Sequence, residues 1–209
     1  TGLSLLIAVP LGIFAAIYLV EYAKRGNRLV SIVRITAETL TGIPSIVYGL
    51  FGFLLFVVAL GWSYTILGGA MTLAIMILPT IMRTTEEALK AVPDSYREGS
   101  FGLGAGKLRT VFQVVLPSAI PGILAGVILG IGRIVGETAA LMYTSGTVAK
   151  YAGAMESGRT LALHMYVLTS EALHVDQASA TAVVLLVIVI GINAFSGFIA
   201  KKLAKKTGE

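Results

Sequence analysis

The sequence predicts an all-α fold, a polytopic bundle of membrane-spanning helices in a single domain over residues 1–209. Of its 209 residues, 56% are hydrophobic and only 13% are charged, and the mean hydropathy is +0.88. Soluble domains carry about 25% charged residues. The long apolar runs do not alternate apolar with polar residues, as strands of a β-barrel would. The N–H and C=O groups of the backbone find no water in lipid, so they must hydrogen-bond to one another within a helix.

Five apolar stretches are long enough to cross the hydrocarbon core of a membrane, which takes roughly 20 helical residues. These predicted spans are Gly2–Val20, Ile43–Leu60, Ile66–Met82, Ile120–Leu141 and Ala178–Ala200. Between the first two, residues 21–41 alternate apolar with basic and polar side chains. This pattern favours an amphipathic helix lying along the membrane surface.

The basic residues indicate how the bundle is oriented. Of the 16 Lys and Arg residues, 13 follow the first span, follow the third span or end the chain. Lys150 and Arg159 fall on the opposite side, and Arg133 falls within a span. The positive-inside rule therefore predicts five crossings with the N-terminus outside and the C-terminus in the cytoplasm. The net charge of +5 is explained by this orientation and does not indicate nucleic-acid binding.

The fourth span is rich in glycine. Gly122, Gly126 and Gly130 recur every four residues, and Gly132 and Gly136 repeat the interval. Small residues at this spacing form a groove that lets another helix approach closely. We therefore expect this helix to be the central one.

The polar segment at about 83–117 is predicted to form a compact unit in the cytoplasm. Thr84 and Ser95 are each followed by Glu three residues later, a capping-box pattern that starts a helix. Pro79 is expected to kink the end of the third span. The helix after Ser95 should stop at Gly104, and a new helix should run from Leu108 to Pro117. Similarly, we expect Thr41 to cap the helix that begins the second span.

Several kinds of chemistry are not supported by the sequence. Cysteine is absent, and the two histidines, His164 and His174, are interpreted as surface residues, so we expect no metal site. The run from Gly102 to Lys107 lacks the earlier glycine and the later Ser or Thr of a phosphate-binding loop. No nucleophile–base arrangement or pair of carboxylates suggests catalysis, so we expect that the chain is not an enzyme by itself and binds no cofactor.

Arg133 and Glu137 are the candidate pathway residues. They lie four positions apart in the glycine-rich span, which would place them one turn apart on one helix face. A charge in the bilayer costs about 2.5–3.5 kcal/mol on insertion scales, so such residues usually face a cavity or a partner. Arg133 could present its guanidinium to an oxyanion. The alternative is a structural ion pair that orients the helix.

The spacing of Glu98-Gly99-Ser100, Gly104, Val114 and Leu116-Pro117 resembles the EAA loop of ABC-importer permeases, with Gly and Ser replacing the paired alanines. Two further segments, 42–51 and 135–141, are similar to permeases of phosphate importers, in particular the PstA type. The resemblance covers most of the chain and implies the type I (MetI-like) permease fold. Such permeases have six helices, so we expect another helix before Thr1.

The resemblance implies a subunit of the cell inner membrane that forms a pathway for inorganic phosphate, with ATP hydrolysed by a separate subunit. It implies as partners a second homologous permease subunit, a cytoplasmic ABC ATPase dimer and an extracytoplasmic phosphate-binding protein. The substrate pathway would include Arg133, Glu137 and Thr138. Coupling to the ATPase would involve Arg97, Glu98, Gly99, Ser100, Gly104, Ala105, Lys107 and Arg109.

Other functions remain open from the sequence alone. An ABC permease for another oxyanion, such as sulfate or molybdate, would share the same features. An ATP-independent channel or secondary transporter could use Arg133 and Glu137 as an ion or proton relay. Dependence of uptake on an ATPase distinguishes these two classes.

Overall fold

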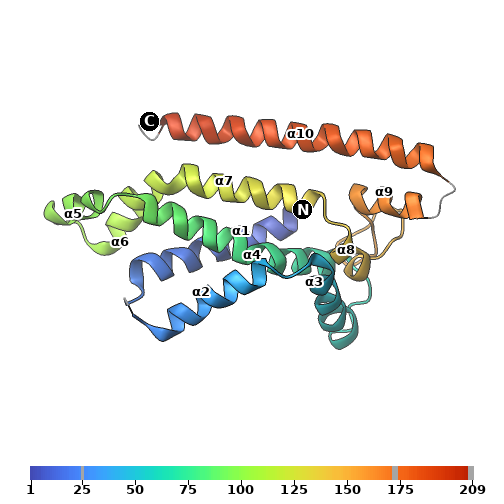
Figure 1. Ribbon diagram of the computed structural model, residues 1–209, viewed down its shortest axis with the longest axis horizontal. Coiled ribbons are helices and arrows are strands. Elements are labelled where there is room, and N and C mark those ends of the chain that lie inside the picture. The colour runs from blue at the N-terminus through green and yellow to red at the C-terminus, as the bar shows by residue number, and fades with distance from the viewer. Residues whose placement is uncertain (25, 171–173, 207–209) are drawn as a thin grey trace.

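The computed structural model describes residues 1–24, 26–170 and 174–206, and within these ranges it is helical without strands (Figure 1). The all-α prediction is confirmed. The long helices are α1 (Gly2–Ile17), α4 (Ile66–Ala91), α7 (Leu116–Val135) and α10 (Val175–Lys206). The shorter helices are α2 (Arg28–Thr41), α3 (Ser45–Gly52), α5 (Asp94–Gly102), α6 (Lys107–Thr110), α8 (Ala139–Thr144) and α9 (Leu161–Ser170). Three π-helical segments extend α1, extend α3 and join α6 to α7: η1 (Tyr18–Tyr22), η2 (Phe53–Ala59) and η3 (Val111–Val115).

Four continuous stretches of the described helices are long and apolar enough to cross a membrane: Gly2–Tyr22, Ile66–Ala91, Lys107–Val135 and Val175–Ile199. The predicted second span, Ile43–Leu60, is a helix over Ser45–Ala59 that meets α2 at a bend of 106°. Its 15 residues reach only about 22 Å, less than the hydrocarbon thickness. The count of five therefore holds only if α2 and this helix together form one broken span.

Helix α4 is the central helix, and the prediction that the glycine-rich helix holds this place was wrong. Within its membrane-length window 61% of α4 is buried, against 28% for the stretch that contains α7. Helix α4 packs against α1, α2, α3, α7 and α8. It buries apolar side chains around its circumference, including Leu73, Met76, Ile77, Ile81 and Leu89. A stripe of glycines, in contrast, serves one close neighbour.

The glycine stripe of α7 does allow a close approach, as predicted, and the neighbour is α4. A methyl group at Gly122 would lie 2.7 Å from the Cβ of Ala88, and one at Gly126 would overlap the hydroxyl of Thr84. At Gly130 it would lie 3.2 Å from Ile81 Cδ1. Residue numbers in these contacts rise along α7 from 122 to 130 while they fall along α4 from 88 to 81, so the two helices are antiparallel and in continuous contact.

This packing predicts opposite effects for two glycine-to-alanine changes on the same helix. Gly126→Ala should lower the melting temperature of the full-length protein in detergent, because overpacking costs about 1–3 kcal/mol where Thr84 leaves no room. Gly132→Ala meets no atom within 4 Å and should be neutral or stabilising, because alanine is the better helix former. Equal melting temperatures for both variants would contradict the close contact.

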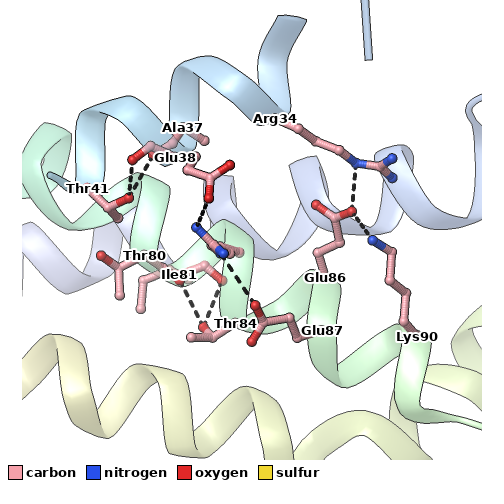
Figure 2. Close-up of polar contacts among 11 residues, drawn as sticks. Arg34, Ala37, Glu38, Thr41, Thr80, Ile81, Thr84, Glu86, Glu87 and Lys90 are labelled. Carbon is pink, nitrogen blue, oxygen red and sulfur yellow. Dashed lines mark hydrogen bonds and ion pairs between the residues drawn. The ribbon is translucent and has the colours of Figure 1, made fainter. Parts of the chain in front are cut away.

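The predicted helix starts and stops near α4 were wrong in three places. Helix α4 continues through Pro79 and Thr84 to Ala91, and the Thr84 hydroxyl donates back to the carbonyl of Thr80 (2.9 Å) and that of Ile81 (3.2 Å) (Figure 2). Thr41 likewise donates to Ala37 and Glu38 and caps nothing. Proline is the N-cap residue of both α3 and α5, at Pro44 and Pro93, so Ser95 lies inside the first turn of α5. At Thr84, the packing on both sides of α4 outweighs the local capping signal.

Helix α10 lies beside α7 and α9 at the edge of the bundle (Figure 1). None of its membrane-length window is buried. Its exposed apolar side chains include Val183, Leu186, Val187, Ile190, Phe195 and Phe198. This confirms the fifth predicted stretch as a helix with an apolar surface suited to lipid or to another subunit.

Candidate functional site: a projecting helix and a broken helix inside the bundle

Helix α5 projects from one end of the bundle (Figure 1), and none of its residues is buried. Tyr96 and Phe101 are about half exposed, and Leu103, directly after the helix, is 91% exposed. Apolar side chains grouped on a polar, projecting segment are typical of a surface that binds another protein. We name residues 92–106, which hold α5 and the turn to α6, the projecting loop.

Gly104 ends α5 in the way that the sequence predicts. Its φ of +82° is in the left-handed region, which L-residues with a side chain enter at a cost. The amide of Gly104 donates to the carbonyl of Phe101 and that of Ala105 to Ser100, at 2.9 and 3.1 Å. This pair of bonds is a Schellman motif, which satisfies the last carbonyls of the helix and turns the chain toward α6.

The second helix of the unit does not end at Pro117, as the sequence had suggested. Helix continues from Lys107 to Val135 without interruption. Pro117 lies in the first turn of α7, directly after η3, where the backbone bonding pattern already changes. The projecting loop is therefore shorter than the predicted segment 83–117, and α6 is continuous with α7 through η3.

Arg97 fastens α5 to the bundle. Its guanidinium donates to Glu21 Oε1 from Nη2 (2.8 Å) and Nε (3.1 Å), and to the carbonyls of Val92 (2.8 Å) and Leu89 (2.9 Å). The side chain is 15% exposed and that of Glu21 is 8% exposed. Arg97 was predicted as a residue that couples to an ATPase, and the structure turns it inward, toward the end of α1.

The remaining predicted coupling residues divide into exposed and anchored side chains. Glu98, Gly99, Gly104, Lys107 and Arg109 are exposed, and Ala105 is half-buried. The hydroxyl of Ser100 lies 2.8 Å from that of Thr110, which ties α5 to α6.

Two of the exposed basic residues also make contacts within the chain. Lys107 Nζ lies 5.2 Å from the centre of the Tyr22 ring, a cation–π contact. Arg109 Nε donates to Gln113 at 2.9 Å. Both ends of the projecting loop are thus linked to η1, through Arg97 of α5 and through Lys107, the first residue of α6.

A second polar network lies next to the projecting loop, between α2 and α4. Glu86 is buried, with an 8% exposed side chain, and its Oε1 forms ion pairs with Arg34 Nε at 2.7 Å and Lys90 Nζ at 2.6 Å. Figure 2 shows both basic side chains converging on this carboxylate. The roles of Glu86 and Glu21 as anchors were not predicted from the sequence, because their partners are on other helices or depend on the helix continuing past Thr84.

The predicted fourth span is broken between α7 and α8, at Gly136, Glu137 and Thr138. The same antiparallel register continues across the break, since a methyl group at Gly69 of α4 would lie 2.9 Å from Leu141 of α8. The break is therefore level with Leu73 of α4, about 10 Å from the start of that helix at a rise of 1.5 Å per residue. Irregular backbone at this depth is tolerated where it is buried in protein or lines a cavity.

Arg133 and Glu137 are near this break and do not form the predicted pair. The Glu137 carboxylate is buried and accepts a hydrogen bond from the amide of Ala140 at 3.1 Å, which satisfies the start of α8. No ion pair joins the two residues in the part of the chain that the structure describes. Arg133 is half-buried in the last turn of α7, where its charge complements the helix dipole.

The two segments of the chain that resemble phosphate-importer permeases meet at this point. A methyl group at Gly49 of α3 would lie 2.8 Å from the Cα of Ala140 in α8. Tyr48 is buried, donates its hydroxyl to the carbonyl of Leu40 (2.8 Å) and belongs to the same buried cluster as Ile134 and Ala140, on either side of the break. We name Tyr48, Arg133, Glu137 and Thr138 the mid-bundle site. Tyr48 is its new member, and its signal in the sequence was the resemblance of residues 42–51.

The two histidines differ in their surroundings. His174 is exposed, as predicted. His164 in α9 is half-buried, and burial, followed by the charge of Arg159, lowers its pKa below the ordinary value. Within the described residues no group of three His, Asp or Glu side chains could hold a metal ion.

A helical bundle with these spans, a projecting helix–glycine–helix unit and a broken inner helix is the architecture of a transport permease. The profile of the family "Binding-protein-dependent transport system inner membrane component" matches residues 8–209. The chain belongs to this family, and it is a multi-pass inner-membrane permease.

The relatives agree with this assignment. The chain is 44% identical over 144 residues to "Probable ABC transporter permease protein YqgI" of Bacillus subtilis, covering 69% of this chain and 49% of that protein. It is 41% identical over 145 residues to "Phosphate transport system permease protein PstA 1" of Mycobacterium tuberculosis, covering 69% and 47%. It is 35% identical over 195 residues to "Phosphate transport system permease protein PstA" of Mycobacterium leprae, and the match covers 91% of this chain and 63% of that protein. The chain thus spans about half to two thirds of the length of these relatives.

Solved structures confirm the fold. The inward-facing MetNI methionine ABC transporter superimposes with a TM-score of 0.75 at 21% identity, covering 97% of this chain and 88% of that one. A bacterial ABC transporter involved in the import of the acidic polysaccharide alginate superimposes with a TM-score of 0.71 at 16% identity. This match covers 96% of this chain and 75% of that one. The predicted MetI-like fold is therefore confirmed.

Proposed function

We propose that the full-length protein forms the membrane pathway of an ATP-driven importer of inorganic phosphate. Relatives named as phosphate transport permeases, at 35–41% identity, support phosphate as the substrate. The observation that carries the mechanism is the projecting loop, whose helix α5 has no buried residue and is fastened from behind by Arg97. Such a helix can dock into a partner protein, and because it is anchored to the bundle, a movement of the partner would move the bundle helices as well.

The proposed partner at α5 is a cytoplasmic ABC ATPase dimer, and ATP is hydrolysed there. Glu98, Gly99, Gly104, Lys107 and Arg109 would form the docking surface, with Ala105 at its edge. A second homologous permease and an extracytoplasmic phosphate-binding protein complete the complex. The α5 end of the bundle is then cytoplasmic, and so is the last turn of α10, which lies at the same end (Figure 1).

The mid-bundle site is the proposed route for the anion. Arg133 lacks an ion-pair partner among the described residues, so its planar donors are available to two oxygens of phosphate at once. Glu137 would not bind the anion, because its carboxylate accepts a hydrogen bond from the amide of Ala140 and so stabilises the first turn of α8. Thr138, beside it in the break, would supply a hydroxyl.

Reconstitution tests this function. Vesicles that hold the full-length permease with its second permease, ATPase and binding protein should take up labelled phosphate only when ATP is inside. Excess sulfate or molybdate should leave that uptake unchanged. Strong competition by either anion would instead assign another oxyanion, and uptake that persists without a working ATPase would assign a channel or secondary transporter.

Arg133→Gln should reduce phosphate uptake by at least about tenfold, because a charge-assisted hydrogen bond to an anion contributes about 1.5–3 kcal/mol. Arg133→Lys should recover only part of the rate, since lysine keeps the charge without the planar fork. Assembly with the partner subunits, measured by co-purification, should be unchanged in both. Lys150→Gln, an equal loss of charge at an exposed side chain between α8 and α9 that pairs only with the exposed Glu156, is the control. Normal uptake by Arg133→Gln would leave Arg133 a purely structural role.

A further inference from the structure

A groove between η1, α2 and the projecting loop is assigned no ligand by the function proposed above, although Arg97 and Lys107 belong to its lining. Its volume is about 1010 Å³. Its lining contains six basic and two acidic side chains. The basic residues are Lys24, Arg28, Arg34, Lys90, Arg97 and Lys107, and the acidic residues are Glu21 and Asp94. We name it the basic groove.

The ion pairs of the described residues leave the basic groove positive. Arg97 is neutralised by Glu21 and Asp94, and Arg34 and Lys90 share the single carboxylate of Glu86. Lys24 and Arg28 make no ion pair in the described part of the chain.

The first turn of α2 adds to this potential. It begins at Arg28, contains no acidic residue and lines the groove through Asn27 and Arg28. The amides of this turn carry the positive end of the helix dipole, and Asn27 Oδ1 accepts a hydrogen bond from one of them, that of Leu29, at 3.0 Å.

We propose that the basic groove binds a phosphate-bearing anion, of which a phospholipid headgroup is the first source and free inorganic phosphate the second. The headgroup is favoured because the groove adjoins apolar surface. Leu19 and Val20 of η1 line it, and α2 exposes Leu29, Ile32 and Ile35. A lipid can therefore place its phosphate among the basic side chains while its acyl chains stay against apolar residues.

The site would hold α2 against the projecting loop. Residues of α2 and of the loop line the same groove, among them Arg28, Asp94 and Phe101. An anion bound there would screen the repulsion of Lys24 and Arg28 from Lys107, which directly follows the loop and also makes no ion pair among the described residues. Membrane composition would then influence the stability of the projecting loop.

The test is binding to the purified full-length permease in neutral detergent, with phosphatidylglycerol, phosphatidylcholine and inorganic phosphate as separate probes and native mass spectrometry as the readout. Phosphatidylglycerol should be retained in preference to phosphatidylcholine. Arg28→Gln should weaken its binding about fivefold, and Lys24→Gln with Arg28→Gln about 25-fold. Arg28→Lys should bind as the wild type does, because it keeps the charge.

Lys202→Gln is the matched control, since Lys202 is exposed near the end of α10 and outside the groove. Binding of inorganic phosphate that is lost in Arg28→Gln, without preference for phosphatidylglycerol, would support the site and assign the free anion as its ligand. The proposal is overturned if neither probe binds preferentially, or if Lys202→Gln and Arg28→Gln weaken binding equally. These readouts do not depend on transport, so they are separate from the test of the proposed function.

Discussion

Replacing Gly104 with valine is expected to lower ATP-driven uptake about 5- to 30-fold while the protein still inserts into the membrane. The left-handed conformation costs an L-residue roughly 1–2 kcal/mol, and a β-branched one more. Gly104 has a φ of +82° and forms the Schellman motif that ends α5. Valine would open this turn and move α5 away from the position in which it docks. Phosphate uptake and phosphate-stimulated ATP hydrolysis in the reconstituted complex measure the effect.

Gly106→Ala is the control for this change, because it alters a glycine two residues away without strain. Gly106 has a φ of −73°, and a methyl group there meets no atom within 4 Å. Its uptake should equal that of the wild type. If Gly104→Val also transports normally, the geometry of the projecting loop does not matter for coupling, and the docking proposal fails.

Replacing Arg97 with glutamine should have the largest effect on stability. Breaking a buried ion pair by removing one partner costs about 3–5 kcal/mol, because the other charge stays buried and unpaired. Glu21 would be that charge, with its 8% exposed side chain. Two carbonyls, of Leu89 and Val92, would also lose their donor. We expect the melting temperature of the full-length protein to fall, and the ATPase to be released from the complex.

The double variant Glu21→Gln with Arg97→Gln separates the ion pair from the single side chains. Two amides can hydrogen-bond without a buried charge, so the double variant should be more stable than Arg97→Gln alone. A double-mutant cycle on the free energy of unfolding measures this coupling. A coupling energy near zero would mean that Arg97 acts only through the backbone carbonyls.

Local patterns were reliable where one energetic term dominates. The stop of α5 at Gly104 was predicted because glycine has little competition at a left-handed position. The contact made by Gly122, Gly126 and Gly130 was predicted because regular spacing on a helix defines a face. The helix starts at Thr84 and Thr41 failed, because the capping preference of one side chain, about 1 kcal/mol, is smaller than the packing of a long buried helix.

The break at Gly136–Thr138 is the main feature of the candidate site that the sequence did not predict. Hydropathy alone continues the fourth span to Leu141, and the spacing of Arg133 and Glu137 then predicts a pair on one helix face. The break depends on the fit of α8 between α3 and α4, where Gly49, Gly52 and Gly69 leave no room for larger side chains. That fit joins residues about 90 positions apart in the chain, so no local pattern records it.

The resemblance to ABC-importer permeases supplied the function of this chain. The sequence by itself determined that the chain is a helical membrane protein, and that an exposed polar loop lies within residues 83–117. Both follow from the cost of burying polar groups in lipid and from the spacing of near neighbours, which are properties of short segments. Only the tertiary structure decided which helix is central, that Arg97 is an anchor to Glu21, and that Tyr48 lies beside the broken helix. These depend on distances between segments far apart in the chain, and such distances are set when all the helices pack together.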